Sequence, residues 1–80
     1  MSTAEQVLEV LAEVAEVDEV YRDPDLRLYD LHILDSMSTV QLLIALSERL
    51  GVELSPAEFD PQQWATPRGI VAYMEQRVGA

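Results

Sequence analysis

The chain has 80 residues, of which fifteen are Asp or Glu, five are Arg and none is Lys or Cys, and its formal net charge is -10. This length accommodates one core, so we expect a single domain over residues 1–80. The charge argues against binding to nucleic acid or to an anionic membrane, because both need clustered basic residues. The absence of Cys excludes disulfides, zinc–thiolate sites and cysteine nucleophiles, and a single His leaves few schemes for metal binding or general-base catalysis.

Hydrophobic residues make up 49% of the chain, which is ordinary for a folded domain. No apolar run is long enough to span a bilayer, and the N-terminus lacks the basic and apolar regions of a secretory signal. We therefore expect a cytoplasmic monomer without membrane insertion. A small acidic domain with so few reactive groups is expected to act by being recognised by other proteins.

The first segment predicts an amphipathic helix. Ser2 precedes it, and Glu5 three residues later completes a capping-box pattern. The helix is expected to end between Glu16 and Glu19, with its glutamates on a solvated face. Its apolar arc consists of Val7, Leu8, Val10, Leu11, Val14, Ala15 and Val17.

Residues 20–34 contain Pro24 and several polar residues that interrupt helical periodicity. We expect a long ordered loop here, and long loops in compact domains are often functional. Its apolar side chains are expected to pin it to the core: Val20, Tyr21, Leu26, Leu28, Tyr29, Leu31, Ile33 and Leu34.

A second helix is predicted to begin after Asp35, since Asp is a good N-cap whose charge suits the positive end of the helix dipole. Its pattern continues to Leu50 and ends at Gly51, in the position where glycine commonly terminates helices.

The last third of the chain contains two further helix starts. Ser55 followed by Pro56 predicts a short helical turn, and Asp60-Pro61 another turn. Thr66-Pro67 predicts the start of a last helix that ends near Val78 and is closed by Gly79. Phe59 is expected to pack inward, whereas Trp64 could lie in the core or at the rim of a partner surface. The residues of the last helix expected to face inward are Ile70, Val71, Met74 and Val78.

The second predicted helix has two apolar faces at the helical spacing of 100° per residue. Leu42, Leu43, Leu46 and Leu50 lie on one side, and Met37, Val40 and Ile44 lie nearly opposite, beside Gln41 and Glu48. One face can be buried in a domain of this size. The other is either a partner surface or is covered by the loop, and periodicity leaves both alternatives open.

Ser36 follows the predicted cap directly. Backbone N–H groups in a first helical turn lack helical partners, and the dipole there is positive. A phosphate attached to the Ser36 hydroxyl would therefore be favourably placed. The alternative is an ordinary serine of a first turn, which is common.

The segment Leu34-Asp35-Ser36-Met37-Ser38-Thr39-Val40-Gln41-Leu42-Leu43 resembles the signature of acyl and peptidyl carrier proteins. The resemblance covers the whole chain and implies an all-α, acyl-carrier-protein-like four-helix bundle with a long first loop and a short third helix. Within the family the sequence is most similar to free-standing D-alanyl carrier proteins. That likeness is carried by the same segment and by Glu58-Phe59-Asp60, Trp64 and Thr66-Pro67.

The resemblance also implies roles for individual residues. Ser36 would carry 4′-phosphopantetheine, supplied from coenzyme A by a phosphopantetheinyl transferase with Mg²⁺, and an amino-acyl or dipeptidyl thioester would be held on that arm. The thiol belongs to the cofactor, so the chain itself needs no catalytic residue and no metal. Expected partners are the transferase, an amino-acid adenylation enzyme and an acyltransferase with a basic docking surface. The matching partner-binding residues are Asp35, Met37, Val40, Gln41, Ile44 and Glu48.

Two pathways fit such a carrier, namely D-alanylation of teichoic acids and polyketide or nonribosomal natural-product (antibiotic) biosynthesis. Every basic residue is Arg, and Ala and Val are frequent, which suits a GC-rich genome. On that compositional ground we favour the biosynthetic pathway over teichoic-acid D-alanylation.

Some of these residues also fit two other classes of function. His32, Asp35 and Ser36 are the residue types of a serine hydrolase, but they lie within five residues, whereas triad members normally converge from separate elements. The second class is an unmodified interaction module that docks to a partner through Met37, Val40 and Ile44. It predicts that Ser36→Ala leaves function intact, whereas a carrier would lose its function completely.

Overall fold

Three α-helices and two 3₁₀ turns make up the regular structure of residues 2–79, the part of the chain that the computed structural model describes, the side chain of Glu58 excepted. The helices are α1 (Thr3–Ala15), α2 (Ser36–Leu50) and α3 (Pro67–Gly79), and the turns are η1 (Glu19–Tyr21) and η2 (Pro56–Glu58). No strand occurs among these residues. The predicted all-α class is confirmed, and the expected short third helix is the single 3₁₀ turn η2.

Local hydrogen bonds at the helix ends account for the boundaries. The side chains of Ser2, Asp35 and Thr66 accept hydrogen bonds from backbone N–H groups three residues later, at 3.1, 2.8 and 3.2 Å. At the C-terminal ends, Glu16 and Gly51 adopt left-handed conformations with φ of 59° and 67°. These caps confirm the predicted helix starts and the glycine end of α2.

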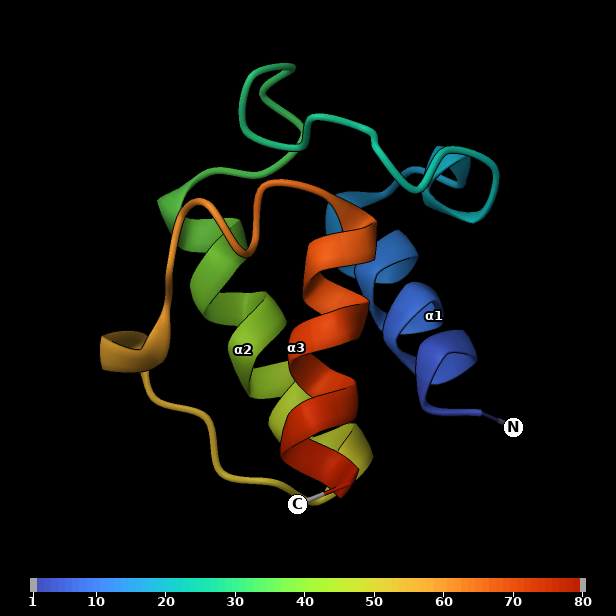
Figure 1. Cartoon of the computed structure of the whole chain (residues 1–80). Coiled ribbons are helices and arrows are strands. Elements are labelled where there is room, and N and C mark those ends of the chain that lie inside the picture. Colours follow the sequence, from blue (N-terminus) through green and yellow to red (C-terminus); the bar gives the residue numbers. More distant parts are fainter. Residues whose placement is uncertain (1, 80) are drawn as a thin grey trace.

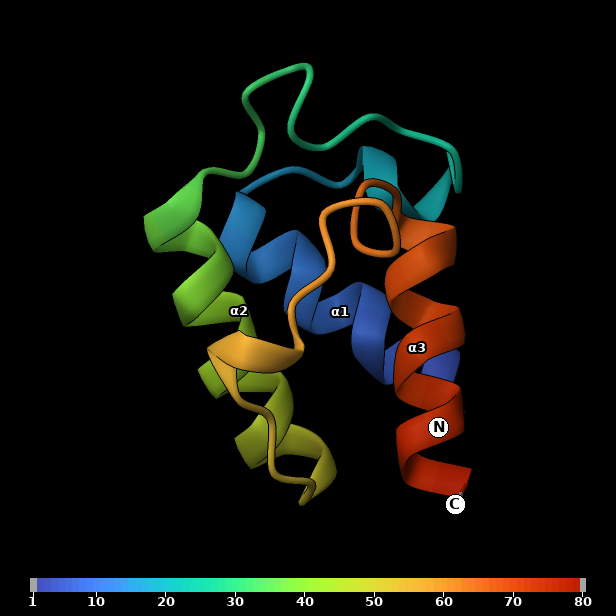
Figure 2. The same ribbon diagram turned by 60° about the vertical axis from the view of Figure 1, so that its left-hand side comes forward.

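Helix α1 packs against both other helices and runs antiparallel to them (Figures 1 and 2). The loop between η1 and α2 crosses one end of the bundle, and residues 51–66 return along α2 to the start of α3. Each helix and both connecting segments contribute to one core. Its buried residues are Val7, Val10, Leu11, Val20, Leu26, Leu28, Leu34, Leu42, Leu43, Leu46, Trp64, Ile70 and Met74.

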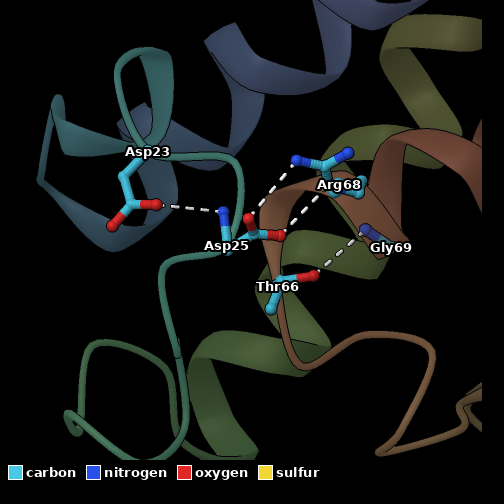
Figure 3. Close-up of polar contacts among 5 residues, drawn as sticks. All are labelled: Asp23, Asp25, Thr66, Arg68 and Gly69. Atoms are coloured by element: carbon cyan, nitrogen blue, oxygen red, sulfur yellow. Dashed lines mark hydrogen bonds and ion pairs between the residues drawn. The ribbon is translucent and has the colours of Figure 1, made fainter.

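The long loop is fastened to the start of α3 (Figure 3). The N–H of Leu28 donates to the carbonyl of Ala65 at 3.0 Å, and the N–H of Arg68 donates to the carbonyl of Pro24 at 2.9 Å. The Arg68 guanidinium also bonds both carboxylate oxygens of Asp25, at 3.1 and 3.3 Å. Since such bidentate pairs fix orientation, the loop is held against α3 by the backbone and by one exposed ion pair.

Pinning by apolar side chains is confirmed for Val20, Leu26, Leu28 and Leu34, which are buried. The prediction was wrong for Tyr21 and Leu31, which are 51% and 58% exposed. Tyr21 ends the 3₁₀ turn in which Val20 fills the core. Leu31 lies in a tight turn closed by hydrogen bonds from Ile33 and Leu34 to the Leu28 carbonyl, which leaves it outside the bundle.

In the C-terminal segment, the structure gives the outcome for two further side chains, Trp64 and Val78. Trp64 is 1% exposed and therefore belongs to the core, with its ring 6.1 Å from that of Phe59 and 5.5 Å from that of Tyr73. The inward orientation predicted for Val78 was wrong, because the last buried residue of α3 is Met74, one turn earlier, and Val78 lies beyond the core.

Among the described residues, no helix is both long and apolar enough to cross a bilayer.

Candidate functional site

Ser36 is the first residue of α2, and its side chain is exposed. The structure gives its hydroxyl no hydrogen-bond partner among residues 2–79. The carboxylate before it is engaged, because Asp35 caps the helix by accepting from the Ser38 N–H. That backbone hydrogen bond holds the pKa of Asp35 below its usual value. The site therefore presents a free hydroxyl beside a fixed negative charge.

The first turn of α2 is braced from the loop side. The Thr39 hydroxyl donates to the Asp35 carbonyl at 2.7 Å, and because this uses its only proton, the Tyr29 hydroxyl must donate to Thr39 Oγ1 at 2.5 Å. Burial raises the pKa of Tyr29 above its ordinary value of 10.0. This chain of two hydrogen bonds ties the loop to the turn that carries Ser36.

An apolar groove of about 480 Å³ opens beside Ser36, between α2 and the segment that contains η2. Phe59 forms part of its wall, half-buried rather than fully inward, with its ring 5.9 Å from that of Tyr29. Sequence reasoning did not find this groove. The proline-rich spacing Pro56, Phe59, Pro61 is the signal that could have suggested an apolar wall. The groove is lined by Tyr29, Ser36, Thr39, Val40, Leu43, Pro56, Phe59 and Pro61.

The outer face of α2 is open. Met37, Val40 and Ile44 are 73%, 46% and 55% exposed, and Gln41 and Glu48 are exposed beside them. The alternative in which the loop covers this face is therefore wrong. Ser36 and this apolar stripe lie on α2, directly after the cap Asp35, and the opposite side of the same helix buries Leu42, Leu43 and Leu46.

The side chains of a hydrolase triad are not assembled. His32 is exposed, with a left-handed φ of 58°, and no hydrogen bond joins it to Asp35 or Ser36 within the described part of the chain. The Asp35 carboxylate is directed to the Ser38 N–H instead. Among residues 2–79 there is also no group of three His, Asp or Glu side chains placed to hold a metal ion.

Comparison with known proteins bears directly on this site. Residues 5–74 match the family model described as a phosphopantetheine attachment site. The chain belongs to this family of carrier proteins. It is 47% identical over 75 residues to the D-alanyl carrier protein of Listeria monocytogenes serotype 4a, an alignment that covers 94% of this chain and 96% of that protein. It is 42% identical over 76 residues to the D-alanyl carrier protein of Staphylococcus saprophyticus, covering 95% and 97%.

Membership confirms the resemblance to carrier proteins, of the D-alanyl type, and the carrier fold. The cofactor of this carrier is covalently attached 4′-phosphopantetheine, and the chain is not itself an enzyme. As a carrier it works with partner enzymes that load and unload it. The exposed hydroxyl of Ser36 lies beside the apolar groove, where a covalently attached flexible arm would have room.

Proposed function

We propose that Ser36 carries the 4′-phosphopantetheine group and that the chain delivers D-alanine for the D-alanylation of teichoic acids. The observation that carries the proposal is the exposed, unpartnered hydroxyl of Ser36 in the first turn of α2, within a chain that matches the phosphopantetheine attachment family. The phosphate would lie at the positive end of α2. When bound, the group supplies a terminal thiol that holds the acyl cargo as a thioester.

The relatives support this pathway over the one that composition favoured. Arg-only basicity favoured natural-product biosynthesis, but the curated relatives that match over most of this chain are named D-alanyl carrier proteins. Composition reflects the genome in which a protein evolved, whereas similarity over nearly the whole length bears more directly on what the protein does. D-alanylation is therefore our proposal, and carriage of an amino-acyl or dipeptidyl group in biosynthesis is the second candidate.

The partners in this proposal are a phosphopantetheinyl transferase, a D-alanine-activating adenylation enzyme and an acyltransferase. They would dock on the exposed face of α2. Activation of D-alanine as an adenylate requires ATP, which supports the expected cytoplasmic location. Exposed apolar side chains flanked by carboxylates suit a basic partner surface with an apolar centre. The residues of the proposed docking face are Asp35, Met37, Val40, Gln41, Ile44 and Glu48.

The attachment site is tested by intact mass after incubation with coenzyme A, Mg²⁺ and a broad-specificity phosphopantetheinyl transferase. We expect the mass of one phosphopantetheine to be added to the wild-type chain and to Ser38→Ala, and no addition to Ser36→Ala. Ser38 is a matched control because it lies in the same helical turn. Modification of Ser36→Ala, or none of the folded wild type while the transferase modifies a control carrier, would overturn the assignment.

The cargo is tested by loading the modified chain with D-alanine or with a panel of other amino acids, each presented by its own activating enzyme. We expect D-alanine to be loaded fastest. Ile44→Arg, first modified to completion with excess transferase, should be loaded more slowly, because the substitution places a cation on the apolar stripe where the adenylation enzyme would dock. Faster loading by an adenylation enzyme of another amino acid would favour the biosynthetic candidate instead.

A further inference from the structure

A second apolar groove, of about 390 Å³, lies between α1 and α3. Ala4 and Leu8 of α1 form one wall, and Val71 and Ala72 of α3 form the other. Tyr21 of η1 closes one end and is half exposed, and the structure gives its hydroxyl no hydrogen-bond partner among the described residues. An aromatic ring with a free polar tip at the end of an apolar groove is typical of an interface anchor.

Tyr21 also lines an acidic hollow of about 570 Å³ on its other side. Glu13, Glu16 and Glu19 line that hollow, and within residues 2–79 Glu16 and Glu19 form no ion pair. The Tyr21 side chain therefore lines both the apolar groove and the acidic hollow.

The charges in the apolar groove itself are also unequal. Arg68 contributes a cation, but Asp25 holds its guanidinium. Glu75, two helical turns further along α3 and so about 10 Å away, forms no ion pair in the described part of the chain. Within the described residues, carboxylates without an ion-pair partner therefore lie on both sides: Glu16 and Glu19 in the hollow next to Tyr21, and Glu75 in the groove itself.

This surface is separate from the site at Ser36. Neither hollow includes a residue of α2 or of the groove beside Ser36. Figures 1 and 2 both place η1 and the start of α2 on opposite sides of the bundle. A protein bound between α1 and α3 would therefore leave the α2 face open.

We propose that the surface formed by Tyr21, the α1–α3 groove and the adjoining glutamates is a second docking site, whose occupant is a partner-protein segment that carries Lys or Arg beside apolar side chains. Charge complementarity selects this occupant. Nucleic acid and anionic membranes would be repelled, and a second copy of this chain brings a net charge of -10. The proposal rests on the carrier function. If the second surface is occupied, the chain can stay bound to one partner there while Ser36 and α2 engage a different enzyme.

The test uses the full chain and a helical peptide of about four turns, with Leu along one face and Lys flanking it. Amide chemical shifts are followed during titration, and a peptide with Glu in place of Lys is the control. Because the acidic α2 face can also attract such a peptide, two variants separate the surfaces. Ala72→Arg places a cation in the α1–α3 groove from an exposed position, and Met37→Arg places one on the exposed face of α2.

We expect the Lys peptide to shift the amides of Leu8, Tyr21 and Ala72 in the wild type and in Met37→Arg. Its affinity at this surface should fall roughly tenfold in Ala72→Arg and in Tyr21→Ala. Shifts confined to α2, equal affinity in Ala72→Arg, or shifts on concentrating the chain alone would overturn the proposal. The mass gain of Ala72→Arg with transferase is measured in parallel. If the wild-type chain gains the normal mass but does not bind the peptide, the docking site is refuted and the carrier function stands.

Discussion

Replacement of Gly69 with Ala should destabilise the protein, although helix propensity argues the reverse. In a helix interior, Gly→Ala ordinarily stabilises by about 1 kcal/mol. Gly69 lies in the first turn of α3, where an added Cβ would lie 1.9 Å from the carbonyl oxygen of Gln63 and 3.1 Å from its carbonyl carbon. Both are backbone atoms, so no side-chain rotation relieves the overlap. The steric effect is therefore expected to dominate.

The size of the stability loss depends on the groups that must shift to make room for the added Cβ. The Gln63 backbone precedes buried Trp64, and the Gln63 side chain donates to the Gly69 carbonyl at 2.8 Å. Overpacking costs about 1–3 kcal/mol, and disturbing this hydrogen bond adds about 1 kcal/mol. After the propensity gain, the net loss is about 2 kcal/mol, out of a total stability of roughly 5 kcal/mol for a core of this size. The urea midpoint should fall by about 1–2 M and the Tm by roughly 10 °C.

Equilibrium unfolding in urea, followed by the fluorescence of Trp64, the only tryptophan, measures this loss. The other two glycines are controls. Gly79→Ala should leave stability unchanged because nothing lies within 4 Å of the added Cβ. Gly51→Ala meets open space but has a φ of 67°, so it should cost about 1 kcal/mol through backbone strain alone. If Gly69→Ala were as stable as the wild type, the close approach of Gln63 to α3 would be refuted.

Three further predictions concern titration and charge. The raised pKa of Tyr29 contributes stability that is complete below pH 10.0 and is lost as pH rises through the folded-state pKa. The stability advantage of the wild type over Tyr29→Phe, measured by urea titration, should therefore be smaller at about pH 11 than at about pH 8, and an equal advantage at both pH values would contradict the burial that raises this pKa. The lowered pKa of Asp35 contributes stability that is present above pH 3.8 and is lost as pH falls through the lower folded-state value. The amide oxygen of Asp35→Asn can also accept the capping hydrogen bond, so this variant should be as stable as the wild type at about pH 7 but should not lose stability as Asp35 is protonated. Acid-unfolding curves measure this difference, and identical curves for the two proteins would argue against the cap. Finally, moderate salt should raise the Tm, because screening of the -10 charge outweighs the weakening of exposed ion pairs; a lower Tm would mean that those pairs dominate.

Helix boundaries could be predicted because their causes are local. The caps at Ser2, Asp35 and Thr66 each join groups three residues apart, so the printed sequence contains both partners. The position of Ser36 followed from the same logic, since a residue after an N-cap necessarily lies in the first turn. The two faces of α2 followed from its period.

Contacts between distant segments could not be predicted in the same way. The attachment of the loop to α3 joins Leu28 with Ala65 and Asp25 with Arg68, pairs about 40 residues apart that no periodicity connects. The ion pair of Glu9 with Arg49, at 2.8 Å, was missed for this reason, and Glu9 was assigned to a solvated face. The groove beside Ser36 depends on the return of residues 56–61 past α2, so its existence is a tertiary fact.

The size of the exposed stripe on α2 limits how tightly a partner can bind there. Full burial of such side chains contributes about 1.5–3 kcal/mol each, and Met37, Val40 and Ile44 are already partly covered, so burying the remainder contributes roughly 4 kcal/mol in all. Association costs at least about 4 kcal/mol in lost freedom, so apolar contact alone yields almost no affinity. The balance must come from attraction between the acidic chain and basic partners, which acts chiefly on encounter rate and weakens in salt. A docking face of this size therefore favours rapid exchange between partner enzymes over a long-lived complex.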